Sequence, residues 1–136
     1  MASIIPKQVK LAIVDGWKNN ETLYACLLTN AFPNTPGAYD VYSDLTNELP
    51  TGVGGYTGGG KPLTVSTSLS GEDALIDAVD IAWTASTFTA KFIVVYDNGA
   101  SKKIRAIYDL GSDYSVTNGT FTVQWNASGL IKISSV

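Results

Sequence analysis

The second half of the chain alternates short apolar runs with turn-forming residues, and this pattern restricts the possible fold more than any other feature. From residue 61 to residue 136, runs rich in β-branched and aromatic side chains are separated by Ser70-Gly71, Asp97-Asn98-Gly99, Asn118-Gly119 and Asn126-Ala127-Ser128-Gly129. Turn residues at such regular intervals, between runs with a period of two, are typical of consecutive antiparallel strands. We therefore expect an all-β fold.

Eight segments have the composition of strands, which is enough for two packed antiparallel sheets. Leu23 to Thr29 and Phe92 to Tyr96 are apolar on both faces, which predicts central positions in a sheet. In the segment 75–83, Asp77 falls on the same face as the apolar residues and is a candidate for a partner-binding or paired carboxylate. The other strands are expected at residues 9–14, 63–69, 104–110, 121–125 and 131–133.

The region between residues 31 and 60 interrupts the strand pattern. Val41, Leu45 and Leu49 are spaced by four residues, which predicts one or two helical turns at residues 39–49 with Asp40 as the N-terminal cap. The glycine-rich residues that follow are expected to form an irregular loop.

Two units of the chain follow from these patterns. Residues 1–8 are expected to form an extended N-terminal arm that contains Pro6. Residues 9–136 are expected to form a single two-sheet antiparallel β-sandwich domain, with one short helical and loop insertion.

Composition excludes several classes of function. The 136 residues suit one domain, and they include no histidine, which is the commonest general base and metal ligand. The net charge is −3 with no basic cluster larger than Lys102, Lys103 and Arg105, so no nucleic-acid partner is expected. Cys26 lies in an apolar run and is expected to be a buried thiol. We expect no catalytic residue, no cofactor and no metal ion.

Neither a secretory signal nor a membrane span is predicted. The start of the chain lacks the charged-then-apolar order of a signal, and no apolar run approaches the roughly 20 residues of a span. We therefore expect folding in a cytoplasm and no membrane partner. Charged residues make up 15% of the chain, and such a weakly charged surface suits contact with other proteins. An ordinary soluble β domain is the alternative.

Two motifs suggest chemistry, and each has a simpler interpretation. Residues 55–61 read GYTGGGK and match the start of a phosphate-binding loop, but Pro62 replaces the required Ser or Thr and a strand pattern follows. Asp40, Asp44 and Glu48 recur every four residues and would line one face of a helix. Such carboxylates could serve a glycoside hydrolase, but we favour a solvated acidic face.

Six residues are the best candidates for contacts with a partner. They are Ile4, Ile5, Pro6, Tyr39, Tyr42 and Tyr56. The three tyrosines lie in the irregular region, where a surface position is expected, and aromatic side chains are favoured at interface centres. The other three lie in the arm, which could pair with the sheet edge of a neighbouring molecule. A sugar-stacking platform is the alternative for the tyrosines, and a disordered chain end for the arm.

Four stretches of the sequence resemble small structural proteins encoded in the virion gene clusters of tailed phages. They read LYACLLTNAF, YDVYSDLTNELPTGVGGYTGGG, IAWTASTFTAKFIVVYD and GTFTVQWNASGLIKI, and the similarity extends over the chain from about Lys10 onward. The resemblance implies a jelly-roll β-sandwich and a place in the virion. Similar proteins include capsid decoration (cement) proteins, head-fibre proteins and minor tail proteins.

These observations predict a non-enzymatic cement protein on the outside of a phage head, assembled in the cytoplasm of the bacterial host. Its partner would be the major capsid protein. It would self-associate as a dimer or trimer, because the symmetry axes of a shell favour symmetric clamps. One alternative is a minor tail or head-fibre protein that binds host glycans, and another is an enzyme that uses the carboxylates of residues 40–48.

Overall fold

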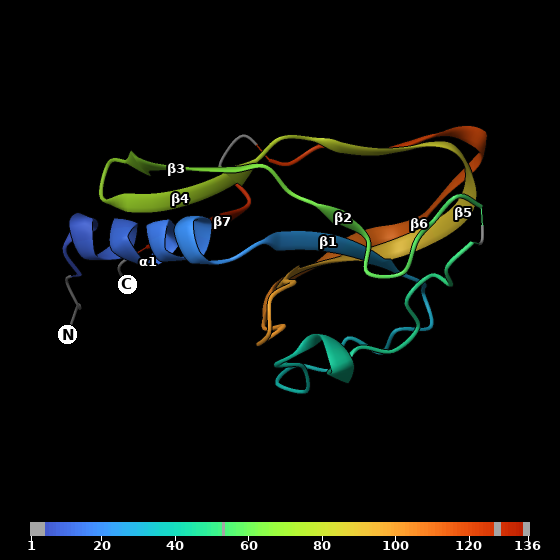
Figure 1. Cartoon of the computed structure of the whole chain (residues 1–136), viewed down its shortest axis with the longest axis horizontal. Coiled ribbons are helices and arrows are strands. Elements are labelled where there is room, and N and C mark those ends of the chain that lie inside the picture. Colours follow the sequence, from blue (N-terminus) through green and yellow to red (C-terminus); the bar gives the residue numbers. More distant parts are fainter. Residues whose placement is uncertain (1–4, 53, 127–128, 135–136) are drawn as a thin grey trace.

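The computed structural model describes residues 5–52, 54–126 and 129–134, and strands make up most of its regular structure. In chain order the elements are α1 (Lys7–Asn20), β1 (Leu23–Leu28), the 3-10 helix η1 (Tyr42–Asp44), β2 (Lys61–Pro62), β3 (Val65–Ser70), β4 (Asp73–Ala78), β5 (Ile81–Asp97), β6 (Ile104–Val123) and β7 (Ile131–Ile133). Antiparallel pairing forms a four-stranded sheet in the order β2-β1-β5-β6 and a three-stranded sheet in the order β3-β4-β7 (Figure 1). The prediction of an all-β sandwich with two antiparallel sheets is confirmed.

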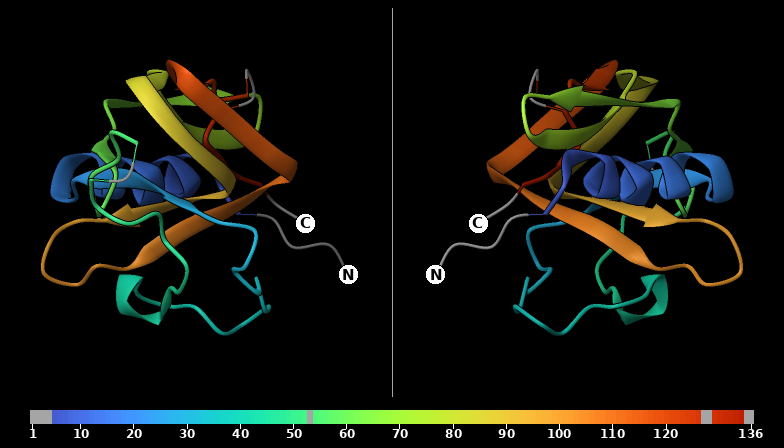
Figure 2. Two further views of the ribbon diagram at one scale, coloured as in Figure 1. Left: turned by 90° about the vertical axis from the view of Figure 1, so that its right-hand side faces the viewer. Right: turned by 90° about the vertical axis from the view of Figure 1, so that its left-hand side faces the viewer.

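A long bent hairpin of β5 and β6 dominates the four-stranded sheet. β5 has 17 residues and β6 has 20, and their pairing shifts register at several points between Trp83 and Phe92. Such irregularities bend a strand. Both strands fold back, so that the half of β5 that follows β4 lies over the half that pairs with β1 (Figure 1, Figure 2). The main core fills the space between these two halves of the hairpin and continues to α1 and β4.

One of the expected turns lies inside a strand. Asn118 and Gly119 belong to β6, which joins the strands expected at 104–110 and 121–125 into one. Asn118 has a positive φ of 45°, and its N–H donates a hydrogen bond to Oγ1 of Thr87 on β5 (3.0 Å). These turn-forming residues therefore produce a local irregularity in the hairpin and not a chain reversal.

β1 is central in its sheet and buried on both faces, as predicted. One face carries Leu23, Ala25 and Leu27 into the main core, which the bent hairpin encloses. The other face carries Cys26 and Leu28 into a second cluster, which the irregular region after β1 covers. The expected buried position of the cysteine thiol is confirmed.

The segment expected to form the first strand is a helix. α1 covers Lys7–Asn20, so the expected strand at residues 9–14 is wrong, and so is the extended arm of residues 1–8 where it overlaps the helix. Leu11 and Val14 lie three residues apart, contribute to the main core, and hold α1 against β3 and β4. A short apolar run does not distinguish a strand from one face of a helix.

The buried face of β4 is the opposite of the expected one. Ala74 and Ile76 are buried, whereas Asp77 lies on the other face with Leu75, and Val79 is 63% exposed. The expectation treated residues 75–83 as one strand, but a break after β4 places the two halves in different sheets. The Asp77 carboxylate accepts a hydrogen bond from the next N–H in the chain (2.8 Å).

The helix expected at residues 39–49 is reduced to the single turn η1. Asp44, and not Asp40, caps this turn, because its carboxylate accepts hydrogen bonds from the N–H groups of Asp40 (3.0 Å) and Val41 (3.1 Å). These bonds favour the ionised form and lower the pKa of Asp44. After η1 the chain has no regular structure up to Glu48, which forms an isolated bridge with Leu28 of β1.

Candidate binding groove

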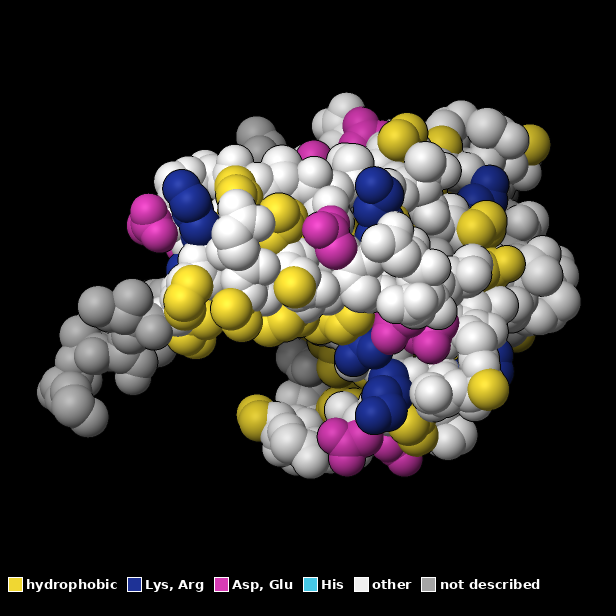
Figure 3. All heavy atoms as spheres, turned by 60° about the vertical axis from the view of Figure 1, so that its left-hand side comes forward, with side chains coloured by type: hydrophobic (Ala, Val, Ile, Leu, Met, Phe, Trp, Pro, Cys, Tyr) yellow, Lys and Arg dark blue, Asp and Glu magenta, His cyan; other side chains and the backbone are white. Residues whose placement is uncertain are grey.

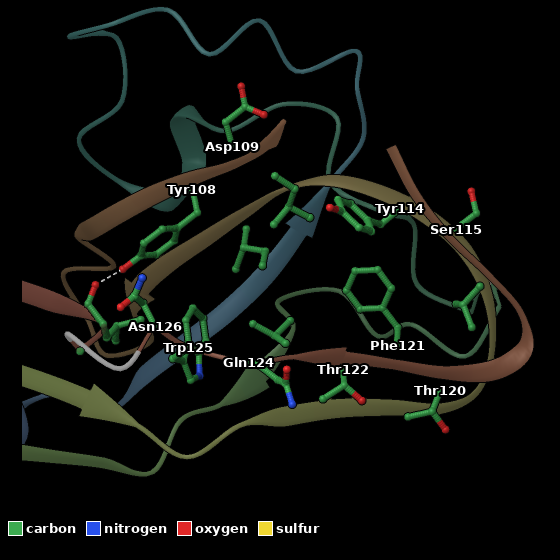
Figure 4. A pocket seen from close by; sticks show the side chains of 16 residues that line it. Tyr108, Asp109, Tyr114, Ser115, Thr120, Phe121, Thr122, Gln124, Trp125 and Asn126 are labelled. Carbon is green, nitrogen blue, oxygen red and sulfur yellow. Dashed lines mark hydrogen bonds between the residues drawn. The ribbon is translucent and has the colours of Figure 1, made fainter. Parts of the chain in front are cut away.

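A cavity of about 670 Å³ lies within the bend of the hairpin, between the two arms of β6. We call it the β6 groove, and it is lined by residues 93, 108–110, 114–116, 120–126, 129 and 130. The first arm of β6 supplies one side, and the second arm with the chain that follows it supplies the other (Figure 4). The groove therefore exists because β6 is folded back on itself.

The side chains that point into the β6 groove are mainly aromatic or aliphatic. Figure 4 shows Tyr108 and Trp125 on one side of the interior, with Phe121 and Tyr114 across from them. The rings of Tyr108 and Trp125 have centroids 5.8 Å apart. Tyr114 is 52% exposed at this site, so an aromatic surface is accessible from solvent.

The polar atoms of the two neighbouring rings are satisfied within the protein. The Tyr108 hydroxyl donates a hydrogen bond to the carbonyl oxygen of Leu130, and Nε1 of Trp125 donates to the carbonyl oxygen of Val79 (3.3 Å). Burial raises the pKa of Tyr108 to about 12, because the phenolate would lose its hydration. Both side chains therefore present apolar surface to the groove.

Polar side chains form the rim of the β6 groove. Asp109, Thr120, Thr122 and Gln124 point away from the interior in Figure 4, because successive residues on a strand face opposite sides of the sheet. Asp109 is the one charged residue among those that line the groove. The site is thus apolar inside and acidic at its margin.

The three tyrosines expected on the surface pack within the protein. Tyr56 is 1% exposed, and its hydroxyl oxygen accepts a hydrogen bond from the N–H of Leu27 (3.0 Å), so its expected surface position is wrong. Tyr39 and Tyr42 are half-buried, and the ring of Tyr39 lies 4.8 Å from that of Phe32. None of the three lines the β6 groove. A contact role for Tyr39 and Tyr42 stays a prediction.

The contact expected in the N-terminal arm lies at the start of α1. Ile4 is outside the described residues, Pro6 occupies the N-cap of α1, and Ile5 is 39% exposed. Val9 (50% exposed) and Ile13 (43% exposed) follow at intervals of four residues, which places them on one helix face. We call Ile5, Val9 and Ile13 the α1 stripe. Figure 3 shows a row of hydrophobic side chains on this side of the molecule.

Glu48 lies in a part-buried network below the glycine-rich loop. Its carboxylate accepts hydrogen bonds from the hydroxyl of Tyr42 (2.6 Å) and the N–H of Gly59 (3.1 Å). Burial, with the nearby Glu48 charge, raises the pKa of the Cys26 thiol, so this thiol stays protonated at neutral pH. The other two carboxylates of the expected acidic face are exposed near η1, so the three do not form a single helix face.

The residues that match a phosphate-binding loop make a close contact with β1. Gly60 has a φ of +79°, and a Cβ atom there would lie 1.8 Å from the carbonyl oxygen of Ala25. The Lys61 ammonium donates a hydrogen bond to the carbonyl oxygen of Ala82 (2.6 Å), and a strand follows where a phosphate site needs a helix. The close packing against β1 explains why a glycine stands at position 60. This agrees with the interpretation of the match to a phosphate-binding loop as a coincidence.

The sequence does not identify the β6 groove, although it predicts part of its lining. Phe121 and Val123 are buried while Thr122 and Gln124 are exposed, which confirms the alternation expected at residues 121–125. The alternation does not predict the bend in β6, which brings this second arm opposite the first. Gly111, which has a φ of +85° within β6, is a signal of irregularity that could have indicated it.

Comparison with protein families, with curated proteins and with solved structures found no match. Within the described ranges, no helix is long and apolar enough to cross a membrane. The same residues contain no group of three or more Cys, Asp or Glu side chains placed to hold a metal ion. The α1 stripe and the β6 groove are the surfaces on which we base a function.

Proposed function

We propose that the protein is a non-enzymatic structural component of a tailed-phage virion, and specifically a cement protein that binds the major capsid protein on the outside of the head. The α1 stripe is the observation that carries this proposal. Exposed apolar surface on a folded body marks sites of contact with other proteins. Val9 and Ile13 of the stripe lie on a helix whose opposite face is fixed in the main core by Leu11 and Val14, and Ile5 lies just before its N-cap.

Two features of the sequence support this role. Nearly the whole chain resembles small structural proteins of tailed-phage virions, in the stretches quoted above. The chain also has 15% charged residues, against roughly 25% in typical soluble domains. Charge is depleted at the centres of protein interfaces, so a weakly charged surface suits a protein that lies against a capsid.

The proposed mechanism is mechanical. A sandwich that spans two capsid subunits adds contacts across the seam between them, and it favours the expanded lattice if it binds that state more tightly. Self-association as a dimer or trimer would let several weak contacts act together, which raises the overall affinity by roughly 10²–10⁴. Each contact can then be small, as the α1 stripe is.

Copy number on purified virions tests the proposal. A cement protein should be present at a copy number comparable with that of the major capsid protein, and it should bind expanded heads better than unexpanded precursors. A scarce band, or equal binding to both head forms, would contradict a cement role.

Substitutions in the α1 stripe test the surface itself. Val9→Gln and Ile13→Gln should leave the fold unchanged and weaken binding to heads at least tenfold, a change of about 1.4 kcal/mol in binding free energy. Val79→Gln is the matched control, because Val79 is also an exposed apolar residue but lies outside α1, in the connection between β4 and β5. If all three variants bind heads equally well, the α1 stripe is not the contact.

A minor tail or head-fibre protein that binds host glycans is the second candidate. The exposed ring of Tyr114 at the β6 groove favours it, because aromatic faces can stack on sugar rings. A low copy number at one end of the particle, together with loss of cell attachment in a Tyr114→Ala variant, would support this candidate over the first.

A further inference from the structure

We propose that the β6 groove accepts an extended segment of a neighbouring virion protein, apolar in its centre and flanked by Lys or Arg, which adds as a strand to β6. This inference rests on the proposed structural role. It assigns a second contact that is separate from the α1 stripe.

Both arms of β6 are sheet edges. β6 is the terminal strand of its sheet and pairs with β5 along one side. From Arg105 onward, no strand of the described chain pairs with its other side. An open edge of this length, in a strand of 20 residues, is a template for strand addition. Main-chain hydrogen bonds then provide affinity, and pockets for alternate side chains provide specificity.

The interior of the β6 groove provides such a pocket. Every second side chain of an added strand points to the same face, so one set would enter the groove. Tyr108, Leu110, Val116 and Trp125 are part-buried there and pack against the main core. Apolar side chains from a partner would complete their burial, and the removal of this apolar surface from water would favour binding. The hydroxyl of Tyr108 and the indole N–H of Trp125 already have acceptors inside the protein.

The charge at the margin indicates which residues should flank the apolar centre. Asp109 lines the β6 groove, and Asp80 accepts a hydrogen bond from the N–H of Trp125 (3.2 Å), which is also a lining residue. The lining residues include no Lys or Arg. Two acidic groups at the margin of an apolar site favour a segment with basic ends, because electrostatic complementarity selects partners and suppresses others.

The cavity is large enough for several side chains, since about 670 Å³ is in the range of sites that hold drug-sized ligands. A small apolar molecule could fill the same volume. It would leave the open edge of β6 without a main-chain partner, whereas a polypeptide strand would fill the interior with its side chains and pair with that edge through its main chain. We therefore favour the strand, and the small molecule becomes an outcome of the test.

Selection from a random peptide library displayed on a carrier tests the inference without assuming a partner. The purified full chain serves as bait, and bound sequences are read after several rounds. The expected result is enrichment of segments that alternate apolar residues in the centre and carry Lys or Arg at the ends. No enrichment, or enrichment of sequences without this alternation, would overturn the proposal.

The position of the bound segment is measured by amide hydrogen exchange with the best selected peptide, made synthetically. Protection should increase along β6 and remain unchanged in α1 and β3. A central proline in the peptide removes an N–H and should lower affinity at least tenfold. Protection confined to other elements, or an anilinonaphthalene sulfonate dye that fills the groove and is not displaced by the peptide, would contradict strand addition.

The charge preference has a matched pair of variants. Asp109→Asn keeps the side-chain oxygen that accepts the N–H of Gly111 but removes the charge at the β6 groove. Glu72→Gln removes a charge from the exposed turn between β3 and β4. The first should weaken binding of the basic-ended peptide several-fold, more so at low salt, and the second should not. Equal effects of the two variants would mean that the acidic margin of the β6 groove does not select peptides with basic ends.

These measurements use the isolated protein, so they can fail independently of the proposed function. If the peptides do not bind but the α1 stripe variants lose head binding, the cement role stands and the strand-addition site is wrong. If the peptides bind at β6 but the protein is scarce on virions, strand addition stands and the cement role is wrong.

Discussion

Arg105 on β6 connects the four-stranded sheet to α1 by an ion pair with Glu21, although 84 positions separate the two residues. Nε of Arg105 donates a hydrogen bond to Oε1 of Glu21 (3.0 Å), and a second guanidinium N–H donates to Oε2. The guanidinium also lies over the ring of Trp17, 4.9 Å from its centroid. Because α1 otherwise packs on β3 and β4 of the three-stranded sheet, this pair fixes the orientation of the helix relative to the four-stranded sheet.

Removing this pair should destabilise the fold. Arg105→Ala leaves the Glu21 carboxylate, 15% exposed, without its charged donor, so the free energy of unfolding should fall by about 1–3 kcal/mol. Lys132→Ala is the control. Nζ of Lys132 lies 3.9 Å from Oδ2 of Asp73, and both side chains are more exposed than those of Arg105 and Glu21. Such exposed pairs contribute about 0–1 kcal/mol to stability. Urea unfolding of both variants is the measurement, and equal losses would contradict the role given to Arg105.

The hydroxyl of Tyr56 should contribute to stability as a buried acceptor. Tyr56→Phe leaves the N–H of Leu27 unsatisfied inside the main core, at a cost of about 1–3 kcal/mol. Tyr39→Phe removes a similar bond to the N–H of Thr35, but this bond is exposed, so water can replace it and the loss should be smaller. If the two phenylalanine variants unfold at the same urea concentration, the hydroxyl of Tyr56 has no special role.

Because the glycine-rich loop approaches β1 closely, we expect a substitution at Gly60 to cause a large loss of stability. Gly60→Ala would place Cβ against the backbone of Ala25, and we expect a loss above about 4 kcal/mol or no soluble protein. Gly71→Ala has a similar positive φ, +60°, but open space around it, so only the left-handed backbone costs about 1–2 kcal/mol. Comparable soluble yields and unfolding midpoints for the two variants would show that the loop is not held this closely.

Local pattern was sufficient to predict the elements whose burial follows from their own residues. β1 and the second half of β5 are apolar on both faces and were expected to be central, and they are. α1 was not predicted, because an apolar run such as residues 9–14 fits both a strand and a helix. The face of β4 was reversed because nothing in the run of residues 75–83 shows that the chain changes sheets there.

The candidate site was less predictable than the fold for a related reason. The β6 groove depends on two segments of one strand, around Tyr108 and Phe121, that face each other because of a bend. The bend depends on the pairing of β6 with β5, and such nonlocal geometry leaves a weak trace in the sequence. Tyr56 was expected on the surface because it lies in an irregular loop, but the loop folds inward and places its ring in the main core.

Alkaline pH should weaken the fold through its buried tyrosines. Burial raises the pKa of Tyr108 to about 12, and it is also the largest cause of the raised pKa values of Tyr42, Tyr56 and Tyr96. The ordinary value in an unfolded chain is about 10. The folded state therefore favours the neutral phenol. The resulting contribution to the free energy of unfolding is fully present below about pH 10 and is lost as the pH rises toward 12 and beyond.

We expect the free energy of unfolding, measured in urea at a series of pH values, to fall with a steepening slope above about pH 10. Phenolate absorbance should show that four of the seven tyrosines resist ionisation until the chain unfolds. Tyr108→Phe loses the hydrogen bond to Leu130 and should be less stable at neutral pH, but it has one fewer group to titrate, so its slope should be shallower. An unchanged slope in this variant would mean that the Tyr108 hydroxyl reaches solvent through the β6 groove, whereas a shallower slope would confirm that this end of the groove is closed to water.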